Sequence, residues 1–183
     1  MIRHAMFLRT IFASLLLITA AFAQQGSNGP AVSVVGSSEV AVKSGSSATV
    51  KLIFRVNPGF HINSNKPNSE LLIPTSLKLS PPSEVMIANV TYPAGEQITF
   101  PFSPDEKLSV YSGDFPVTAL VRTAKGTPTG RFRVHGEIKF QACNDRQCFP
   151  PKSTPIEFDV TVQKAASGTK HRRNPAQSPH IKG

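Results

Sequence analysis

The 183-residue sequence contains no tryptophan and only two cysteines, Cys143 and Cys148. The absence of tryptophan and of a distant cysteine excludes the core arrangement of antibody domains, in which a tryptophan packs against a disulfide joining the two sheets. One cysteine pair without a paired histidine motif is also poor support for zinc, which normally takes four ligands. We therefore expect no metal and no cofactor, and we place any chemistry of the chain at its two cysteines.

No apolar run in the sequence is long enough for a membrane-spanning helix, which needs about 20 residues. The apolar run over residues 11–20 follows a basic start and precedes the small-residue site Ala21-Phe22-Ala23. This layout is typical of a secretory signal peptide over residues 1–23. We expect cleavage after Ala23, export of a soluble protein to the periplasm, and a flexible segment over residues 24–30.

The net charge of +9 belongs mostly to the two ends of the chain. Two of the 20 basic residues lie in the expected signal peptide and five lie in residues 164–183, which leaves 13 basic against 11 acidic residues, or +2, for residues 24–163. Because no basic stripe remains there, nucleic acid is not an expected partner. Residues 164–183 contain one large apolar residue and are expected to form a disordered basic tail.

Helix signals are nearly absent between these ends, where prolines and glycines separate short runs of alternating apolar and polar residues. Eight or nine such strands, with a turn signal about every ten residues, predict one all-β domain over residues 31–163, an antiparallel sandwich or barrel. The pair 108–111 and 115–121 is expected to form a hairpin across Ser112-Gly113-Asp114. The expected strands cover residues 31–35, 48–56, 60–63, 71–79 with a break at Pro74, 85–92, 108–111, 115–121, 131–140 and 156–162.

Four residues separate the two cysteines, which follow the long strand that ends at Phe140. A four-residue connection between antiparallel strands places the flanking residues opposite one another, so a Cys143–Cys148 disulfide is geometrically plausible. A ring of about six residues stabilises a fold by only about 2 kcal/mol, against nearly 5 kcal/mol for a ~100-residue ring. Arg146 would favour a thiolate here and Asp145 would oppose one. The pair is therefore either redox-active or an inert loop staple.

Residues 140–151, FQACNDRQCFPP, resemble the active-site segment of the N-terminal periplasmic domain of DsbD-type thiol:disulfide interchange proteins. The shared pattern is an aromatic-Gln-x-Cys, a short polar loop, and then Cys-aromatic-Pro-Pro. Residues 59–63, 92–95 and 110–111 fall at similar spacings. The resemblance departs from the family pattern in a loop that is often one residue longer there, and in His61 and Asn63, which stand where aromatic residues are expected.

The resemblance implies an immunoglobulin-like antiparallel β-sandwich and a relay of reducing equivalents. Cys148 would form the mixed disulfide with a partner, and Cys143 would resolve it. A cap loop containing Phe100 and Phe102 would shield the disulfide. The segments that carry the resemblance also supply four expected neighbours of the site: His61, Asn63, Tyr111 and Arg146.

The implied partners are thioredoxin-like or other thiol-disulfide proteins of the cell envelope. The 183 residues contain neither a membrane electron carrier nor a thioredoxin-like CxxC segment, so the resemblance also implies a separate membrane carrier. The alternative is a non-catalytic immunoglobulin-like module for binding or assembly in the envelope, in which the disulfide is structural.

Overall fold

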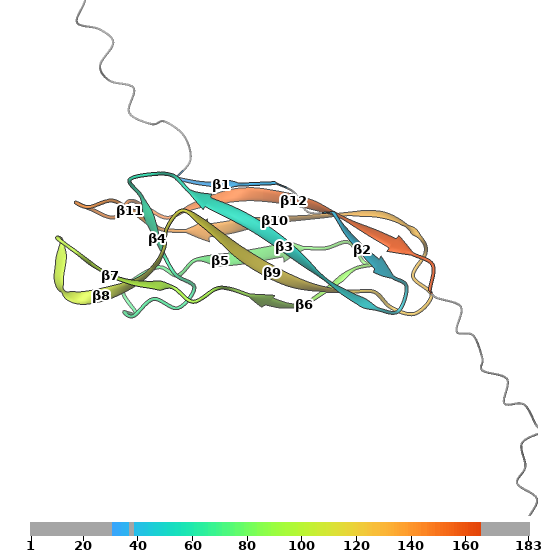
Figure 1. The fold of residues 1–183 in the computed structure, drawn as a ribbon. Helices are drawn as coiled ribbons and strands as arrows, with labels where there is room; N and C mark the ends of the chain where they lie inside the picture. Colours follow the sequence, from blue (N-terminus) through green and yellow to red (C-terminus); the bar gives the residue numbers. More distant parts are fainter. Residues whose placement is uncertain (1–30, 37–38, 166–183) are drawn as a thin grey trace, which may run out of the picture. The chain divides into compact units, whose positions relative to one another are not determined.

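The computed structural model describes residues 31–36 and 39–165, which form twelve strands and no helix (Figure 1). In this part of the chain no helix has the length and hydrophobicity to cross a membrane. The expected signal peptide, the segment 24–30 and nearly all of the expected tail lie outside the described residues. The strands are β1 (Val32–Val34), β2 (Val40–Lys43), β3 (Ser47–Val56), β4 (His61–Asn63), β5 (Ser76–Ser80), β6 (Met86–Thr91), β7 (Glu96–Phe100), β8 (Ser103–Tyr111), β9 (Asp114–Arg122), β10 (Gly130–Phe140), β11 (Ala142–Cys143) and β12 (Lys152–Gln163).

The strands form three four-stranded sheets with the orders β1-β3-β9-β6, β2-β12-β10-β5 and β11-β4-β8-β7. All pairs are antiparallel except β12 with β2, which run parallel. The predicted all-β, immunoglobulin-like sandwich is confirmed. The strand count is higher than expected because β2, β7 and β11 are short or lack a clear alternation, and the sequence pattern did not reveal them.

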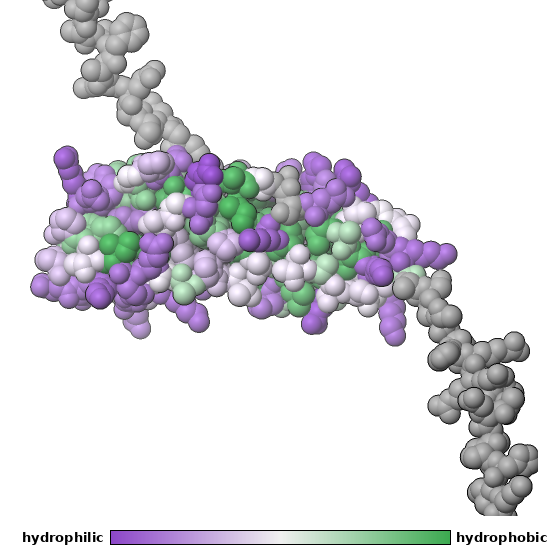
Figure 2. Space-filling view, in the orientation of Figure 1, coloured by the Kyte–Doolittle hydropathy of each residue, from purple (hydrophilic) through white to green (hydrophobic). Residues whose placement is uncertain are grey.

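The main core is built by alternation along the long strands of the first two sheets. In β3 every second residue from Val50 to Val56 is buried, and β12 repeats this pattern from Ile156 to Val162. These side chains belong to one apolar cluster, in which the rings of Phe54 and Phe115 stack at 5.6 Å. On the face visible in Figure 2, hydrophilic residues cover most of the surface and hydrophobic residues form separate patches.

The expected hairpin between residues 108–111 and 115–121 was wrong. β8 pairs with β4 and β7, whereas β9 pairs with β3 and β6, so the two segments belong to different sheets. Gly113, with a φ of 59°, turns the chain from one sheet to the other, and its carbonyl accepts a bond from the Val56 N–H at 2.8 Å. The rings of Tyr111 and Phe115 on either side of this turn stack at 4.6 Å in the core.

Residues 71–74 are also not a strand. They form a turn and an extended connection, in which the Leu72 N–H donates to the Ser69 carbonyl at 3.2 Å. Pro74 has no N–H to donate to a neighbouring strand, which explains why this apolar run does not pair.

The third sheet lies at one end of the sandwich, where β4, β7, β8 and β11 are drawn together in Figure 1. Because side chains alternate along a strand, the register places Ile62, Tyr111 and Ala142 on one face, and all three belong to the main core. The other face carries a second apolar cluster of Phe100, Leu108 and Val110. This second face also carries His61 and Cys143, so it positions the site.

Gly136 is a position where the fold has no room for one added carbon. It lies in β10 between Leu79 of β5 and Ile156 of β12, and a Cβ there would collide with the Lys78 carbonyl oxygen and lie 2.8 Å from Leu79 Cδ2. We expect Gly136→Ala to lower the free energy of unfolding by about 1–3 kcal/mol, as overpacking does. Urea denaturation measures the change.

The matched control is Gly130→Ala on the same strand. A Cβ at Gly130 would meet its nearest atom, Phe132 Cε2, at 3.6 Å, which is an ordinary contact. We expect this variant to stay within about 0.5 kcal/mol of the parent. Equal effects of the two substitutions would contradict the close packing of β5 against β10.

Candidate functional site

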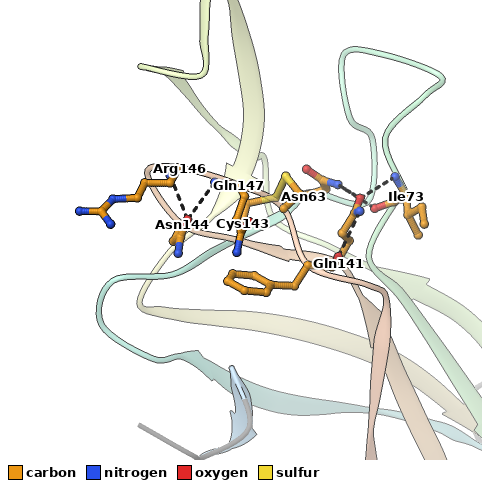
Figure 3. Close-up of a disulfide and its surroundings, with 9 residues drawn as sticks. Asn63, Ile73, Gln141, Cys143, Asn144, Arg146 and Gln147 are labelled. Carbon is orange, nitrogen blue, oxygen red and sulfur yellow. Dashed lines mark hydrogen bonds between the residues drawn. A yellow bond between two sulfur atoms is a disulfide. The ribbon is translucent and has the colours of Figure 1, made fainter. Parts of the chain in front are cut away.

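Cys143 and Cys148 form a disulfide, with their Cα atoms 3.9 Å apart and an isolated antiparallel bridge between their backbones. Cys143 is the last residue of β11, and that short strand pairs with β4, so that Cys143 lies opposite His61. Figure 3 shows the disulfide and the side chains around it. The predicted bond between the two cysteines is therefore present.

The two sulfur-bearing residues differ sharply in exposure. Cys143 is 0% exposed, because it lies within the third sheet next to β4. Cys148 is exposed, since it follows the polar loop on the outer side of the bridge. The two bonded cysteines therefore differ in environment, with the Cys148 residue open to solvent and Cys143 enclosed by the fold.

The loop between the cysteines is held by its own hydrogen bonds. The Asn144 N–H donates to the Gln147 carbonyl at 2.9 Å, and the Phe149 N–H donates to the Ala142 carbonyl at 2.8 Å. Asn144 Oδ1 accepts the backbone N–H groups of Arg146 and Gln147, both at 2.9 Å. The loop geometry thus has support that is independent of the disulfide.

His61 forms an aromatic stack with the two predicted cap residues. Its ring lies 3.8 Å from that of Phe100 and 6.3 Å from that of Phe102, with nearly parallel planes. Phe100 is buried and Phe102 is 37% exposed, at the turn between β7 and β8. The structure therefore brings Phe100, Phe102 and His61 together on the face that carries Cys143.

Burial lowers the pKa of His61 below its ordinary value of 6.5, and the carboxylate of Asp145 opposes this by raising it. The burial effect is the larger of the two. His61 is 4% exposed, so its imidazole is neutral near pH 7.

Asn63 and Gln141 form a polar network beside the disulfide (Figure 3). The Asn63 amide nitrogen donates to the Ile73 carbonyl at 3.0 Å and to Gln141 Oε1 at 3.2 Å. Gln141 Nε2 in turn donates to the Phe149 carbonyl at 3.3 Å, just past Cys148. This network ties β4, the 71–75 connection and the segment after the second cysteine to one another.

Two of the predicted neighbours lie away from the disulfide. Tyr111 is on the opposite face of the third sheet, where its hydroxyl donates to Asn65 Oδ1 and Pro93 O at 2.6 and 3.0 Å. The backbone N–H of Arg146 belongs to the loop, but Figure 3 shows its side chain extending away from the disulfide. Tyr111 therefore packs in the core, and Arg146 presents its charge to solvent.

Sequence reasoning did not identify the roles of Gln141 and Asn144. An Asn directly after a cysteine is a signal for a turn in which the side chain accepts backbone N–H groups, so Asn144 could have been found. Gln141 belongs to the aromatic-Gln-x-Cys pattern, but its structural role could not be predicted, because its partners come from distant segments.

Within the described residues, no group of three or more His, Cys, Asp or Glu side chains is placed to hold a metal ion.

Comparison with known proteins gives one family match. The model of the N-terminal domain of the thiol:disulfide interchange protein DsbD matches residues 32–160. No curated protein matches the chain.

Several solved structures are similar to this chain at low identity. The reduced DsbD N-terminal domain of Neisseria meningitidis is 20% identical, with a TM-score of 0.38, over 61% of this chain and 74% of that one. The N-terminal periplasmic domain of ScsB from Proteus mirabilis is 11% identical, with a TM-score of 0.42, and the match covers 71% of this chain and 44% of that one. A type I cohesin from Pseudobacteroides cellulosolvens is 16% identical, with a TM-score of 0.47, and the match covers 76% of this chain and 97% of that one.

Gln141→Leu tests the polar network. Leucine has a similar size but leaves the buried Asn63 amide and the Ile73 N–H without this acceptor, so we expect a loss of about 1–3 kcal/mol in the free energy of unfolding. Urea denaturation of the oxidised protein measures it. Gln147→Leu in the exposed loop is the control and should change stability by less than about 0.5 kcal/mol. An unchanged free energy of unfolding in Gln141→Leu would contradict the network.

His61 should make the protein sensitive to acid. Because burial lowers its folded pKa below the unfolded value of 6.5, its contribution to stability is complete above pH 6.5 and is lost as the pH falls toward the folded pKa. We expect His61→Phe, which keeps a stacked ring, to flatten the fall in stability below pH 6.5. Denaturation midpoints between pH 5 and 8 measure this. His135→Phe, at an exposed histidine 2.9 Å from Glu157, is the control. An unchanged pH profile in His61→Phe would refute the prediction.

Proposed function

Since this chain belongs to the family of N-terminal domains of the thiol:disulfide interchange protein DsbD, we propose that it exchanges disulfides with thioredoxin-like proteins of the bacterial envelope. In this role it relays reducing equivalents through Cys143 and Cys148. The observation that carries the proposal is the unequal exposure of the two bonded cysteines, one exposed and one fully buried.

The exchange proceeds in two balanced steps. A partner thiolate attacks Cys148 Sγ, so that a mixed disulfide forms, the Cys143–Cys148 bond breaks, and Cys143 leaves with the electron pair as a thiolate. A second thiolate of the partner then attacks its own sulfur in the mixed disulfide and releases Cys148. The partner dithiol is thereby oxidised to a disulfide and the domain is reduced. The reverse sequence, with Cys143 resolving the mixed disulfide at Cys148, passes the two electrons on.

The loop is suited to repeated opening of the bond. Its turn is held by Asn144 and by the bond from Phe149 to Ala142, so the backbone keeps its shape without the covalent link. The chain-entropy gain from a six-residue ring is only about 2 kcal/mol, so losing it leaves most of the stability of a domain intact.

The proposal includes a periplasmic location after removal of a signal peptide, and a separate membrane carrier that supplies the electrons. In it, the hairpin turn with Phe100 and Phe102 acts as the cap over the disulfide. The support for the cap is the ring stack with His61, which lies opposite Cys143.

Trapping of the mixed disulfide tests this function. The Cys143→Ser variant keeps the exposed Cys148, which can be converted to its mixed disulfide with thionitrobenzoate. We expect a thioredoxin-like domain with one active-site cysteine to displace thionitrobenzoate and form a stable protein–protein disulfide, seen by mass spectrometry. The matched Cys148→Ser variant leaves only the buried Cys143 and should react at least tenfold more slowly.

The alternative of a structural disulfide gives a different outcome. It predicts that thioredoxin-like dithiols leave the Cys143–Cys148 bond of the unmodified protein oxidised, with a reduction potential below about −300 mV. That result, together with equal reactivity of the two single-cysteine variants, would overturn the proposed exchange and leave a non-catalytic envelope module.

A further inference from the structure

Two buried polar atoms beside the disulfide have no hydrogen-bond partner among the described residues: His61 Nε2 and Asn63 Oδ1. His61 is 4% exposed and Asn63 is 0% exposed. An unpaired polar group in such a position costs about 1–3 kcal/mol, so native structures rarely leave one without a reason. Here two lie two residues apart on the same strand, β4.

The register places both side chains on the face that carries Cys143. His61 lies directly opposite Cys143, and the Asn63 N–H donates to the Gln141 carbonyl, which continues the same ladder by two residues. Directly opposed residues on one face have their Cβ atoms about 4.5–5.5 Å apart, and diagonal neighbours lie about 7–8 Å apart. Both side chains are therefore within reach of the Cys143 sulfur.

The orientation of the Asn63 amide is fixed by its nitrogen. That nitrogen donates to two acceptors, the Ile73 carbonyl and Gln141 Oε1, so the amide cannot turn over without losing both bonds. Oδ1 is consequently held as a free acceptor, and Figure 3 shows Asn63 beside the disulfide. In the His61 ring, stacking on Phe100 fixes the plane in which Nε2 lies.

We propose that His61 and Asn63 receive the Cys143 sulfur when the disulfide opens, His61 by donating its ring N–H to the thiolate and Asn63 by accepting the S–H of the thiol. This inference rests on the proposed exchange function. A bonded sulfur carries neither a proton nor a negative charge, which explains why the two polar atoms have no partner in the oxidised form. Reduction gives the Cys143 sulfur first the negative charge and then the proton.

The step balances as follows. When the partner thiolate bonds to Cys148 Sγ, the electron pair of the broken bond stays on Cys143 Sγ, and the His61 N–H hydrogen-bonds to this charge. The Cys143 thiolate then takes a proton from solvent, and the resulting S–H donates a hydrogen bond to Asn63 Oδ1. A buried thiolate without such a donor would have its pKa raised and would be a poor leaving group.

The pKa of the Cys143 thiol in the Cys148→Ser background tests the inference, because Cys143 is then the only thiol. Ultraviolet absorbance of the thiolate across pH reports the pKa without any partner protein. Adding His61→Phe keeps the stacked ring but removes the donor, and should lower the thiolate fraction at a given pH roughly tenfold, the effect of one charge-assisted hydrogen bond. His61→Gln, which restores an N–H donor, should recover part of it.

Asn63→Ala should shift the pKa the opposite way, by a few-fold in thiolate fraction, because it removes the acceptor of the S–H. His135→Phe is the matched control and should leave the pKa unchanged. General loosening of the fold would expose the thiol and could not raise its pKa, so an increase in His61→Phe is specific.

An unchanged pKa in His61→Phe would overturn the inference, even if the mixed disulfide at Cys148 still forms. Failure of that mixed disulfide with a normal pKa shift would overturn the exchange function instead. If Cys148→Ser does not fold, the equilibrium of the intact pair with a dithiol buffer at pH 7 and 9 replaces the titration. His61→Phe should then change the pH dependence of that equilibrium, and an unchanged dependence would refute the role of His61.

Discussion

Ala142 and Cys143 pair with Ile62 and His61 in a ladder of only two residues, and the position of the disulfide depends on this ladder. Since side chains alternate between faces, a slip by one residue would turn Cys143 into the main core and Ala142 outward. The ladder is kept in register by its neighbours on both sides. Ile62 is buried in the core, and the Asn63 side chain bonds to Gln141, the residue just before β11.

This arrangement separates the two sulfur atoms by environment although they share one bond. Cys143 is buried because it lies in the third sheet, and Cys148 is exposed because it follows the loop. Burial alone would disfavour a thiolate at Cys143, since removing a charge from water is unfavourable. In the role proposed above, the His61 N–H offsets that penalty for the thiolate, and Asn63 Oδ1 accepts the S–H of the protonated thiol.

The sequence pattern predicted those parts of the fold that depend on a single segment. β3 and β12 alternate strictly, so their existence and inward faces followed from the residues themselves. The disulfide followed from the spacing of Cys143 and Cys148. Choice of strand partner did not follow, because alternation is the same whichever strand lies alongside, and thus the parallel pairing of β2 with β12 was not foreseen.

The composition of the site was only partly predictable for the same reason. His61, Phe100 and Cys143 come from three distant segments, and only the tertiary fold brings them to one face. The family resemblance supplied His61 and Asn63 as neighbours, but it also supplied Tyr111, whose side chain lies on the opposite face. The position of a residue on a strand therefore indicates which sheet it belongs to, and the register decides which face of that sheet its side chain occupies.

Release of the Phe100 ring from His61 requires less free energy than unfolding of the sandwich. A stacked ring pair is worth about 0.5–1.5 kcal/mol and burial of one phenylalanine about 1.5–3 kcal/mol, both well below the 5–15 kcal/mol of a typical domain. Displacing Phe100 from His61 thus falls within the range of local opening. Because Cys148 is exposed with the hairpin in place, the first attack does not require this motion. In the proposed function the hairpin acts as a cap over the face with His61 and Cys143, and as such a cap it would set how much water reaches the buried sulfur.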